Sequence, residues 1–533
     1  MFRALLTTAS VIVAVVACSE VGSEGNGPFD EPIRPELTEF AETSSYADVM
    51  DYVRLAEAAS PSLHLTTFGY SNEGRPLPLL VAGRVEGAGA ESVRSLDLPV
   101  ILLLGNIHAG EVAGKEALLR LLRRIANGEA EPWLDNVVLL IAPIYNADGN
   151  EKMDLGNRPR QHGPFGGMGT RSNVQGLNLN RDQMKLDAPE ARSLAHLLNE
   201  YDPEVVVDLH TTNGTRHAYH LTYSPPLHPA TPGAIDALLR AELLPEVTER
   251  VEGEYGWHFW HYGNVATRDG VPGWYTFDHR PRFVTNYAGL RNRIGILSEA
   301  YSYASFEDRI LATERFVDEI VEWVGEHADR VRSVVREADA LDLPGTSLPV
   351  RAGFPTEGEP TTILMGDVVE APHPWTGQPV LLRTDDVLPQ EMPAFIHFEG
   401  TLTEEVPAAY LVPADQRQVL DRLRAHGIRM ETEAGPTGSA QAFRVDAVDV
   451  SETLFEGRNE VQLEGRWMEP ALVPGGEALL GVEHVRVPMD QPLARLAFLL
   501  LEPLADDGFL YWGIFEGYAV GEPFPLLRVP VDR

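Results

Sequence analysis

One stretch of sequence decides the fold class, and it reads Val100-Ile101-Leu102-Leu103-Leu104-Gly105-Asn106-Ile107-His108-Ala109-Gly110-Glu111. Its unbroken apolar run predicts a strand at Pro99–Leu104 that is buried on both faces of a sheet. The residues that follow predict a helix from Glu111 to Ala126. A histidine and a glutamate therefore stand at the carboxyl end of a buried strand, which is where α/β sheets bind ligands.

The same alternation of apolar strands and helices continues from about Tyr46 to His327. Further strands are expected at Val137–Ala142, Glu204–Leu209 and Arg293–Ser298, and further helices at Ala188–Glu200, Ala234–Thr248 and Phe306–His327. This order predicts an α/β domain over residues 45–335, with a mixed, largely parallel central sheet flanked by helices.

The texture of the sequence changes beyond about Asp339. Prolines become frequent, and short alternating runs such as Ala442–Val450 and Glu460–Trp467 indicate strands. One helix is expected near Ala414–His426. Residues 340–533 are therefore predicted to form a β-rich accessory domain.

The composition excludes several classes of protein. Of the 533 residues, 44% are hydrophobic and 23% are charged, which is enough apolar surface for real cores and excludes a mainly disordered chain. The chain has 43 basic and 79 acidic residues, so no nucleic-acid partner is expected, because binding phosphates needs a positive surface. A single cysteine excludes an intramolecular disulfide, and any metal must be held by His, Asp and Glu side chains.

The first residues predict export. Arg3 precedes a largely apolar run, Ala4–Val16, which is short for a membrane span and is typical of a signal peptide at residues 1–17. Because the run ends in Ala17-Cys18, it resembles a bacterial lipoprotein signal, in which the cysteine is lipidated and becomes the mature N-terminus. The alternative is an ordinary signal peptide in which Cys18 has no role.

The lipoprotein interpretation has consequences for the location of the protein. Residues 18–44, rich in Gly, Glu, Ser and Pro, are expected to be a flexible tether. The protein is then expected in the periplasm or on the cell surface, held at the membrane only through the lipid on Cys18.

Two histidines and a glutamate could hold a metal ion. His108 and Glu111 are three residues apart in a turn, so both can reach the same ion. A second buried strand, Val205–Leu209, ends in His210. Two histidines and one carboxylate leave the fourth position of a catalytic zinc site open. The alternative for His210 alone is a strand-end histidine whose hydrogen bonds are satisfied.

Two more segments place polar or acidic residues beside predicted helices and strands. The polar turn Gly-Leu-Asn-Leu-Asn-Arg-Asp at 176–182 precedes a helix, and the buried strand Ile-Gly-Ile-Leu-Ser-Glu at 294–299 ends in a carboxylate. With His108, Glu111 and His210, these segments resemble the zinc carboxypeptidase (M14) family from Gly69 to the helix after Glu299, about half of the chain. No HExxH, GxSxG or GxxxxGK(S/T) motif supports a different hydrolase or nucleotide-binding class.

The resemblance implies a role for each of these residues. His108, Glu111 and His210 would hold one Zn²⁺ per chain. Glu299 would be the general base and then the general acid. Asn180 and Arg181 would bind the free C-terminal carboxylate of a peptide substrate, since a guanidinium bonds both carboxylate oxygens at once.

Two roles that the family gives to an arginine and to a tyrosine have more than one candidate residue in this sequence. Arg171 is expected to stabilise the oxyanion of the reaction, with Arg158 and Arg160 as nearby competitors. The mobile tyrosine of the family is assigned to Tyr287, with Tyr275 and Tyr301 as alternatives.

The sequence departs from the family at two places in the site. Asn178 stands where the family usually has an aspartate that orients a zinc-binding histidine. An amide accepts the same hydrogen bond but brings no negative charge, so a lower metal affinity or rate is expected. Ala109-Gly110 also leaves no basic side chain between the two ligands, where family members often have one.

Other residues of interest are expected to be structural. The histidines outside the motif, His217, His220, His258 and His261, are interpreted as loop or core residues among aromatic side chains, and the alternative is a second metal site. Near the chain end, Tyr511-Trp512 and Phe515 are interpreted as core, and the alternative is an aromatic platform that faces substrate.

The sequence therefore predicts an exported, lipid-anchored zinc metallocarboxypeptidase that acts on peptides with a free C-terminal carboxylate. One alternative is a zinc-dependent deacylase of N-acyl amino acids with the same site. The other is a surface binding protein that keeps the fold without turnover. The presence of Glu299 argues against the last, because binding alone needs no general base.

Overall fold

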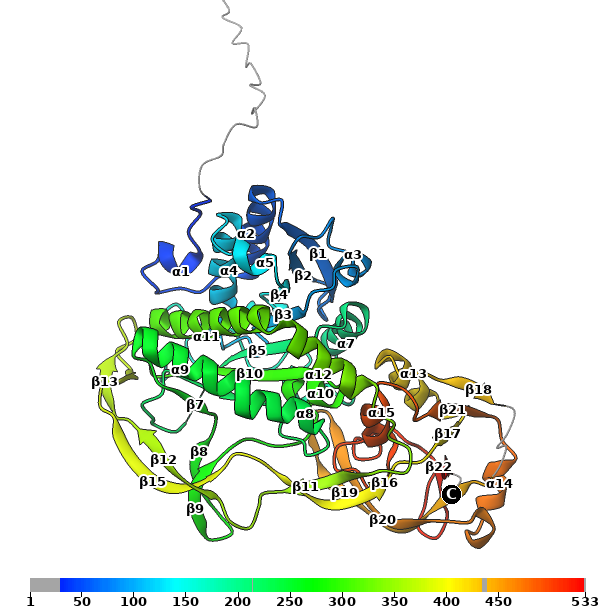
Figure 1. Ribbon diagram of the computed structural model, residues 1–533. Coiled ribbons are helices and arrows are strands. Elements are labelled where there is room, and N and C mark those ends of the chain that lie inside the picture. The colour runs from blue at the N-terminus through cyan, green and yellow to red at the C-terminus, as the bar shows by residue number, and fades with distance from the viewer. Residues whose placement is uncertain (1–28, 213, 434–438, 532–533) are drawn as a thin grey trace, which may run out of the picture.

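The computed structural model describes residues 29–212, 214–433 and 439–531 (Figure 1). The predicted signal peptide and Cys18 lie outside these residues. The described chain begins with a mixed α/β half and continues into a β-rich C-terminal region, which confirms the predicted fold class. None of its described helices combines the length and the apolar character needed to cross a membrane.

The central sheet determines where the predicted site residues lie. Within the described residues it has eight strands in the order β1-β2-β4-β3-β5-β10-β6-β7. Their bounds are β1 Leu63–Tyr70, β2 Pro76–Ala82, β3 Val100–Gly105, β4 Val138–Ala142, β5 Val205–Thr211, β6 Leu221–Ser224, β7 Phe259–His261 and β10 Ile294–Ala300. The central strands β4, β3, β5 and β10 run parallel. All residues of β3, β4 and β5 are buried, which explains the unbroken apolar runs in the sequence.

Helices cover both faces of this sheet. Helix α4 (Ala113–Ala126) packs on β3 and β5 and against α2 (Tyr46–Ala59) and α11 (Phe306–Glu326), while α10 (Val284–Leu290) packs on the opposite face of β5 and β10. Gly114 allows α4 to lie close to β5, because a Cβ there would be 2.6 Å from the Cβ of Leu209. This close approach brings the residues just before α4, including Glu111, to the end of β5.

The helix expected at Ala234–Thr248 is longer and less regular than predicted. The structure has one continuous helical segment made of α8 (Gly233–Ala237), the wider π-type turn η2 (Leu238–Leu243) and α9 (Leu244–Tyr255). Pro245 has no N–H for a backbone hydrogen bond, and the wider turn just before it accommodates that loss. The segment ends at Gly256, whose φ of 68° few other residues adopt readily.

The C-terminal region shares a sheet with the first half. Strands β12 (Glu359–Met365) and β15 (Leu388–Phe395) join β9 (Val271–Tyr275) and β8 (Asn264–Arg268) in the order β12-β15-β9-β8. Strand β15 runs parallel to β9, with Ala394 beside Trp274 and Phe395 beside Tyr275. The two parts of the chain are therefore connected by backbone hydrogen bonds as well as by side-chain contacts.

The remaining C-terminal strands form three further sheets within the described residues. Strand β11 (Ser347–Gly353) pairs with β16 (Glu399–Glu405), and β13 (Val368–Pro372) pairs with β14 (Pro379–Arg383). The largest sheet contains β17 (Ala409–Pro413), β18 (Glu431–Glu433), β19 (Gln441–Phe455), β20 (Arg458–Met468), β21 (His484–Pro488) and β22 (Pro523–Val529). In Figure 1 this orange and red part lies at one end of the central sheet.

Two helices of the C-terminal region face the first half. Helix α13 (Arg417–Ala425) packs near α7 (Pro189–Tyr201), and α15 (Ala494–Leu501) packs near α10. The aromatic residues near the chain end, Tyr511, Trp512 and Phe515, are 4%, 0% and 3% exposed. Their interpretation as core residues is therefore confirmed.

Candidate metal centre and substrate cavity

Three buried side chains meet at the carboxyl ends of β3 and β5. The Nδ1 atom of His108 lies 3.1 Å from Oε1 of Glu111, and the Nδ1 atom of His210 lies 2.7 Å from Oε2 of the same carboxylate. One ligand atom from each residue lies within 4.8 Å of the others. Among the residues that the structure describes, this is the one group of three or more His, Cys, Asp or Glu side chains with such spacing.

Hydrogen bonds on the far side of each imidazole determine which nitrogen faces the group. Oδ1 of Asn178 accepts a hydrogen bond from the backbone N–H of Asn180 at 3.0 Å, so the amide oxygen is the atom that faces Nε2 of His108, also at 3.0 Å. Nε2 of His108 must then carry the proton. Oδ2 of Asp208 accepts from Nε2 of His210 at 2.8 Å in the same way. Both Nδ1 atoms are thus directed at Glu111.

Burial and neighbouring charges set the protonation of the three residues. Burial lowers the pKa of His108 to about 3, which keeps the ring in the neutral form that binds metals. Burial alone would favour a neutral Glu111, but His108, Arg158 and His210 outweigh it and hold the pKa of this carboxyl well below its usual range. Burial would also favour a neutral His210, but Asp208 and Glu111 outweigh it and raise the pKa of this ring. The group therefore attracts a positive charge between His210 and Glu111.

The donor set fits a zinc ion. Two imidazoles and one carboxylate are ligands that zinc prefers, and three protein ligands are typical of catalytic rather than structural sites. Each imidazole also has a partner that fixes its orientation, as metal-binding histidines usually do. His108, Glu111 and His210 could therefore hold Zn²⁺.

Arg158 provides the basic side chain that is missing between the two ligands of the turn. Its Nη2 contacts Oε1 of Glu111. Its side chain passes beside Gly110, where an added Cβ would lie 3.5 Å from Cγ and Nε of Arg158. A Cβ at position 110 would also lie only 2.8 Å from the backbone oxygen of Gly169, so the turn leaves no room for a side chain there. Arg171 also approaches the group, with Nη1 at 3.5 Å from the same carboxylate oxygen.

Glu299 stands beside the group on the neighbouring strand. It is the register partner of His210 in the parallel pair formed by β10 and β5. Burial, with a further contribution from Glu111, raises the pKa of Glu299 to about 8. Its Oε2 atom is buried and has no hydrogen-bond partner among the described residues. A carboxyl group with a raised pKa and a free oxygen is suited to proton transfer near neutral pH.

A cavity of about 610 Å³ opens over these side chains. It is lined by seven of the predicted site residues, namely His108, Glu111, Arg171, Asn180, Arg181, His210 and Glu299. Aromatic and aliphatic walls come from Tyr262, Phe277, Phe283, Leu297 and Tyr303. The cavity thus combines a group of side chains that could hold a metal ion, a carboxyl group with a raised pKa and an apolar wall.

Arg181 brings an unpaired positive charge into this cavity. It belongs to the 3₁₀ turn η1 (Leu179–Arg181), and its guanidinium lies 3.9 Å from the ring centroid of Phe283. Its Nη1 donates to the backbone oxygen of Asn180 at 2.7 Å, and no carboxylate of the described residues forms an ion pair with it. Burial, together with Arg171 and Arg282, lowers the pKa of Arg181 to about 10, so the guanidinium stays charged at neutral pH.

Tyr287, the predicted mobile tyrosine, is not part of this cavity. It lies fully buried in α10, and its hydroxyl is 2.7 Å from Nδ1 of His426. The physical reason is the orientation of α10, which presents this residue to α13 of the C-terminal region. The alternatives lie elsewhere too, since Tyr275 stacks on Phe395 and Tyr301 packs on His217. The tyrosines that do line the cavity are Tyr262 and Tyr303.

Sequence reasoning also missed Asp208. This residue precedes His210 by two positions, and alternate residues of a strand point to the same face. That period is the signal that could have paired the two side chains. Three of the extra histidines pack as expected against aromatic rings: His217 against Tyr301, His220 against Trp257 and His261 against Tyr223, with centroids 4.2, 4.8 and 5.0 Å apart. The fourth, His258, has its Nδ1 atom 3.3 Å from Oε1 of Glu252 instead.

Comparisons with known proteins point to one family. The family model of the zinc carboxypeptidases matches residues 49–232. Carboxypeptidase E of Caenorhabditis elegans is 33% identical over 144 residues, which are 25% of this chain but only 29% of that relative. Carboxypeptidase 2 of Trichophyton rubrum is 22% identical over 487 residues, or 86% of this chain and 81% of the relative. A solved metallo-carboxypeptidase from Burkholderia cenocepacia is 16% identical, with a TM-score of 0.40 over 54% of this chain and 70% of its own.

Proposed function

We propose that the chain is a member of the zinc carboxypeptidase family, whose family model matches residues 49–232, and that it is a zinc-dependent metallocarboxypeptidase that hydrolyses the C-terminal peptide bond of peptides. The observation that carries the proposal is Arg181, a partly buried guanidinium without a carboxylate partner among the described residues, in the same cavity as His108, Glu111 and His210. A cation in this place favours substrates that carry a carboxylate next to the scissile bond.

The metal group would hold one Zn²⁺ per chain. When bound by His108, Glu111 and His210, the ion supplies a Lewis acid that polarises the scissile carbonyl and lowers the pKa of water. The protein side chains then have separate tasks around it. Asn180 and Arg181 bind the substrate carboxylate and so hold the peptide bond at the ligand group.

Glu299 moves the proton. It takes a proton from the attacking water on its free Oε2 and delivers it to the nitrogen of the leaving amino acid. A neighbouring cation favours the ionised form of this carboxyl, whose pKa burial has raised to about 8. The same group can therefore act as a base in the first step and as an acid in the second.

Arg171 is the arginine best placed to stabilise the oxyanion. Its side chain is 43% exposed at the cavity, and its Nη1 lies 3.3 Å from Nδ1 of His108. Arg158 is instead engaged by the carboxylate of Glu111, and its side chain is only 12% exposed. A guanidinium that can move toward developing negative charge suits the role.

Product analysis on matched substrates tests the proposal. We compare a peptide with a free C-terminus, the same peptide with a C-terminal amide, and an N-acyl amino acid, and identify the products by mass. The free peptide should lose one residue, and the amide should react at least about 100-fold more slowly, since it cannot pair with Arg181. Preferred cleavage of the N-acyl amino acid would assign a deacylase. No turnover of any of the three by zinc-loaded protein would favour a binding role.

We further propose that the protein is exported and anchored through a lipid on Cys18. The support is the position of this cysteine directly after the apolar leader. In cells, Cys18→Ser should move the protein from the membrane fraction to the soluble fraction while the catalytic cavity stays intact. Membrane attachment that persists in this variant would contradict the anchor.

A further inference from the structure

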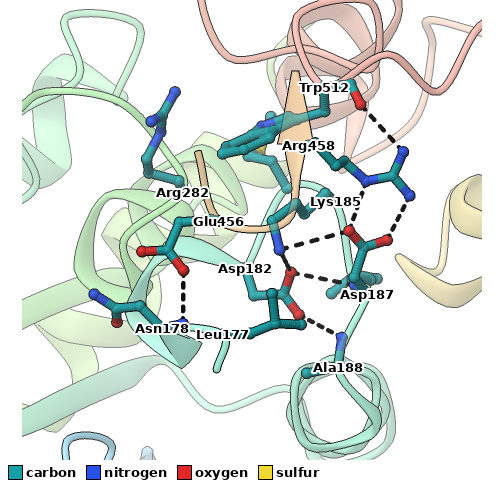
Figure 2. A network of polar contacts seen from close by, with 12 residues as sticks. Leu177, Asn178, Asp182, Lys185, Asp187, Ala188, Arg282, Glu456, Arg458 and Trp512 are labelled. Carbon is teal, nitrogen blue, oxygen red and sulfur yellow. Dashed lines mark hydrogen bonds and ion pairs between the residues drawn. The ribbon is translucent and has the colours of Figure 1, made fainter. Parts of the chain in front are cut away.

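One hairpin of the C-terminal region reaches the metal group. Strands β19 and β20 are joined by the tight turn Glu456-Gly457, in which both residues have positive φ, 47° and 83°. The turn lies against the loop that precedes η1, where a Cβ at Gly457 would be 3.2 Å from Cδ2 of Leu177. Oε2 of Glu456 accepts a hydrogen bond from the backbone N–H of Asn178 at 2.7 Å (Figure 2).

Asn178 carries this contact on to a metal-binding ring. Its side-chain Oδ1 accepts from Nε2 of His108 at 3.0 Å. Two hydrogen bonds, joined through the covalent bonds of Asn178, therefore connect the carboxylate of Glu456 with the ring of His108. This connection begins in the C-terminal region and ends at a predicted zinc ligand.

A partly buried ionic network holds the hairpin in this position (Figure 2). Arg458, at the start of β20, donates to both carboxylate oxygens of Asp187 at 2.6 and 2.7 Å and to the backbone oxygen of Trp512 at 3.2 Å. Asp187 also accepts from Arg422 at 2.7 Å and lies 3.6 Å from Nζ of Lys185. The turn residue Glu456 is thus anchored to the segment that follows η1.

The two imidazoles of the metal group differ in the hydrogen-bond partners of their Nε2 atoms. His210 has a carboxylate, Asp208, directly on its Nε2. His108 has only the neutral amide of Asn178, but a carboxylate, Glu456, is bonded to the peptide of that same residue. A negative charge behind a metal-binding histidine makes the ring a stronger ligand and fixes its orientation.

We propose that Glu456 is a positioning residue of the metal group. Its carboxylate holds Asn178 in place and supplies, from the C-terminal region, the negative charge that the amide does not bring to His108. This inference rests on the zinc site of the proposed function. It gives the hairpin β19–β20 a part in the chemistry of the first half of the chain.

Zinc affinity of the full-length chain, measured by competition with a chromophoric chelator, tests the inference independently of turnover. Glu456→Ala removes the acceptor, and we expect zinc affinity to fall by about 3- to 10-fold, less than the 10- to 100-fold of a direct partner. Glu456→Gln keeps an acceptor of the same shape but removes the charge, so its loss should be smaller, about 2- to 5-fold. Glu452→Ala is the matched control, because Glu452 is exposed on the same hairpin. Its zinc affinity should equal that of the wild type.

A double-mutant cycle separates positioning from a general effect on the fold. If Glu456 acts through the side chain of Asn178, then Glu456→Ala should have no further effect on zinc affinity in an Asn178→Ala background. Asn178→Asp, which supplies the charge directly, should restore the affinity of Glu456→Gln. Equal losses in both backgrounds would overturn the inference, as would an unchanged affinity in folded Glu456→Ala.

The same measurements separate this inference from the proposed function. A wild-type protein that binds zinc but cleaves no peptide contradicts the proposed function, and the comparison of variants still decides the role of Glu456. An active carboxypeptidase whose zinc affinity does not respond to Glu456→Ala keeps its function and refutes the positioning role.

Discussion

Glu299 and His210 are register partners on the parallel strands β10 and β5, so the proposed general base and a proposed zinc ligand stand side by side. Neighbouring strands lie about 4.8 Å apart and are held by a backbone ladder. The relative position of the two groups is thus set by the sheet rather than by a loop. Proton transfer benefits from this rigidity, because a small displacement of either group costs rate.

Glu299→Gln should abolish most turnover and leave zinc in place. The amide cannot take up the proton, and general acid–base catalysis contributes about 10²- to 10⁴-fold, so kcat should fall by that factor. Zinc content, measured by elemental mass spectrometry, should stay at one ion per chain because Glu299 is not one of the proposed zinc ligands. Glu307→Gln, at an exposed position early in α11, serves as the control. Activity of Glu299→Gln within tenfold of the wild type would contradict the mechanism.

Arg181→Ala should damage only the recognition of free C-termini. Loss of one partner from a buried charge pair costs about 2 to 4 kcal/mol, so kcat/KM for a peptide with a free C-terminus should fall by about 30- to 1000-fold. The slow reaction of the amidated peptide should hardly change. Arg216→Ala is a suitable control, since that side chain is 55% exposed and its carboxylate partner lies 3.7 Å away. Equal losses of kcat/KM on both substrates would show that Arg181 does not bind the substrate carboxylate.

Asn178→Asp should strengthen zinc binding. The new carboxylate would stand directly on Nε2 of His108 and make the ring a stronger ligand. We expect a gain of about 2- to 5-fold, and a larger gain when Glu456 is already replaced by glutamine. Chelator competition and kcat measure the effect. If zinc affinity and rate both stay at the wild-type values, the amide of Asn178 lowers neither of them.

Glu502 should make stability depend on pH. It is 1% exposed, and its carboxyl accepts hydrogen bonds from the hydroxyl of Tyr410 at 2.6 Å and from Nε1 of Trp467 at 3.0 Å. Burial raises its pKa from 4.5 to about 7, although these hydrogen bonds oppose the rise. As pH increases, the unfolded chain therefore releases the proton before the folded chain does. The stability that this group contributes is complete below about pH 4.5 and is lost as pH rises through about 7.

Urea denaturation of the wild type and Glu502→Gln at pH 5 and pH 8 measures this effect. The glutamine variant stays neutral, so its free energy of unfolding should fall less over this interval than that of the wild type. The difference should be a few kcal/mol, about 1.4 kcal/mol for each unit of pKa change. Parallel pH dependence of the two proteins would mean that Glu502 keeps an ordinary pKa.

The parts of the site that lie in local sequence patterns could be predicted. His108 and Glu111 share one turn, and His210 and Glu299 each end an apolar run, so strand prediction alone places them at one edge of the sheet. Asp208 could have been added from the alternation of side chains along β5. These predictions need only the period of the element and the parallel direction of the central strands.

Other parts depend on contacts between distant segments. Tyr287 turns away from the cavity because α10 packs toward His426, which is 139 residues further along the chain. Glu456 meets Asn178 across 278 residues, and a glutamate in a hairpin turn belongs to no motif. Neither periodicity nor spacing can report which face of a helix or which hairpin will be covered by a second region of the protein.

The shared sheet β12-β15-β9-β8 determines how the chain can be divided. Removing the residues after about 340 would strip β15 from β9 and bring Trp274, now 0% exposed, toward water. The uncovered strand would present an open edge to other copies, which is a known route to aggregation. A shortened chain that ends at the apparent boundary is therefore expected to be insoluble rather than a smaller working enzyme. Any search for a minimal active fragment should keep both halves.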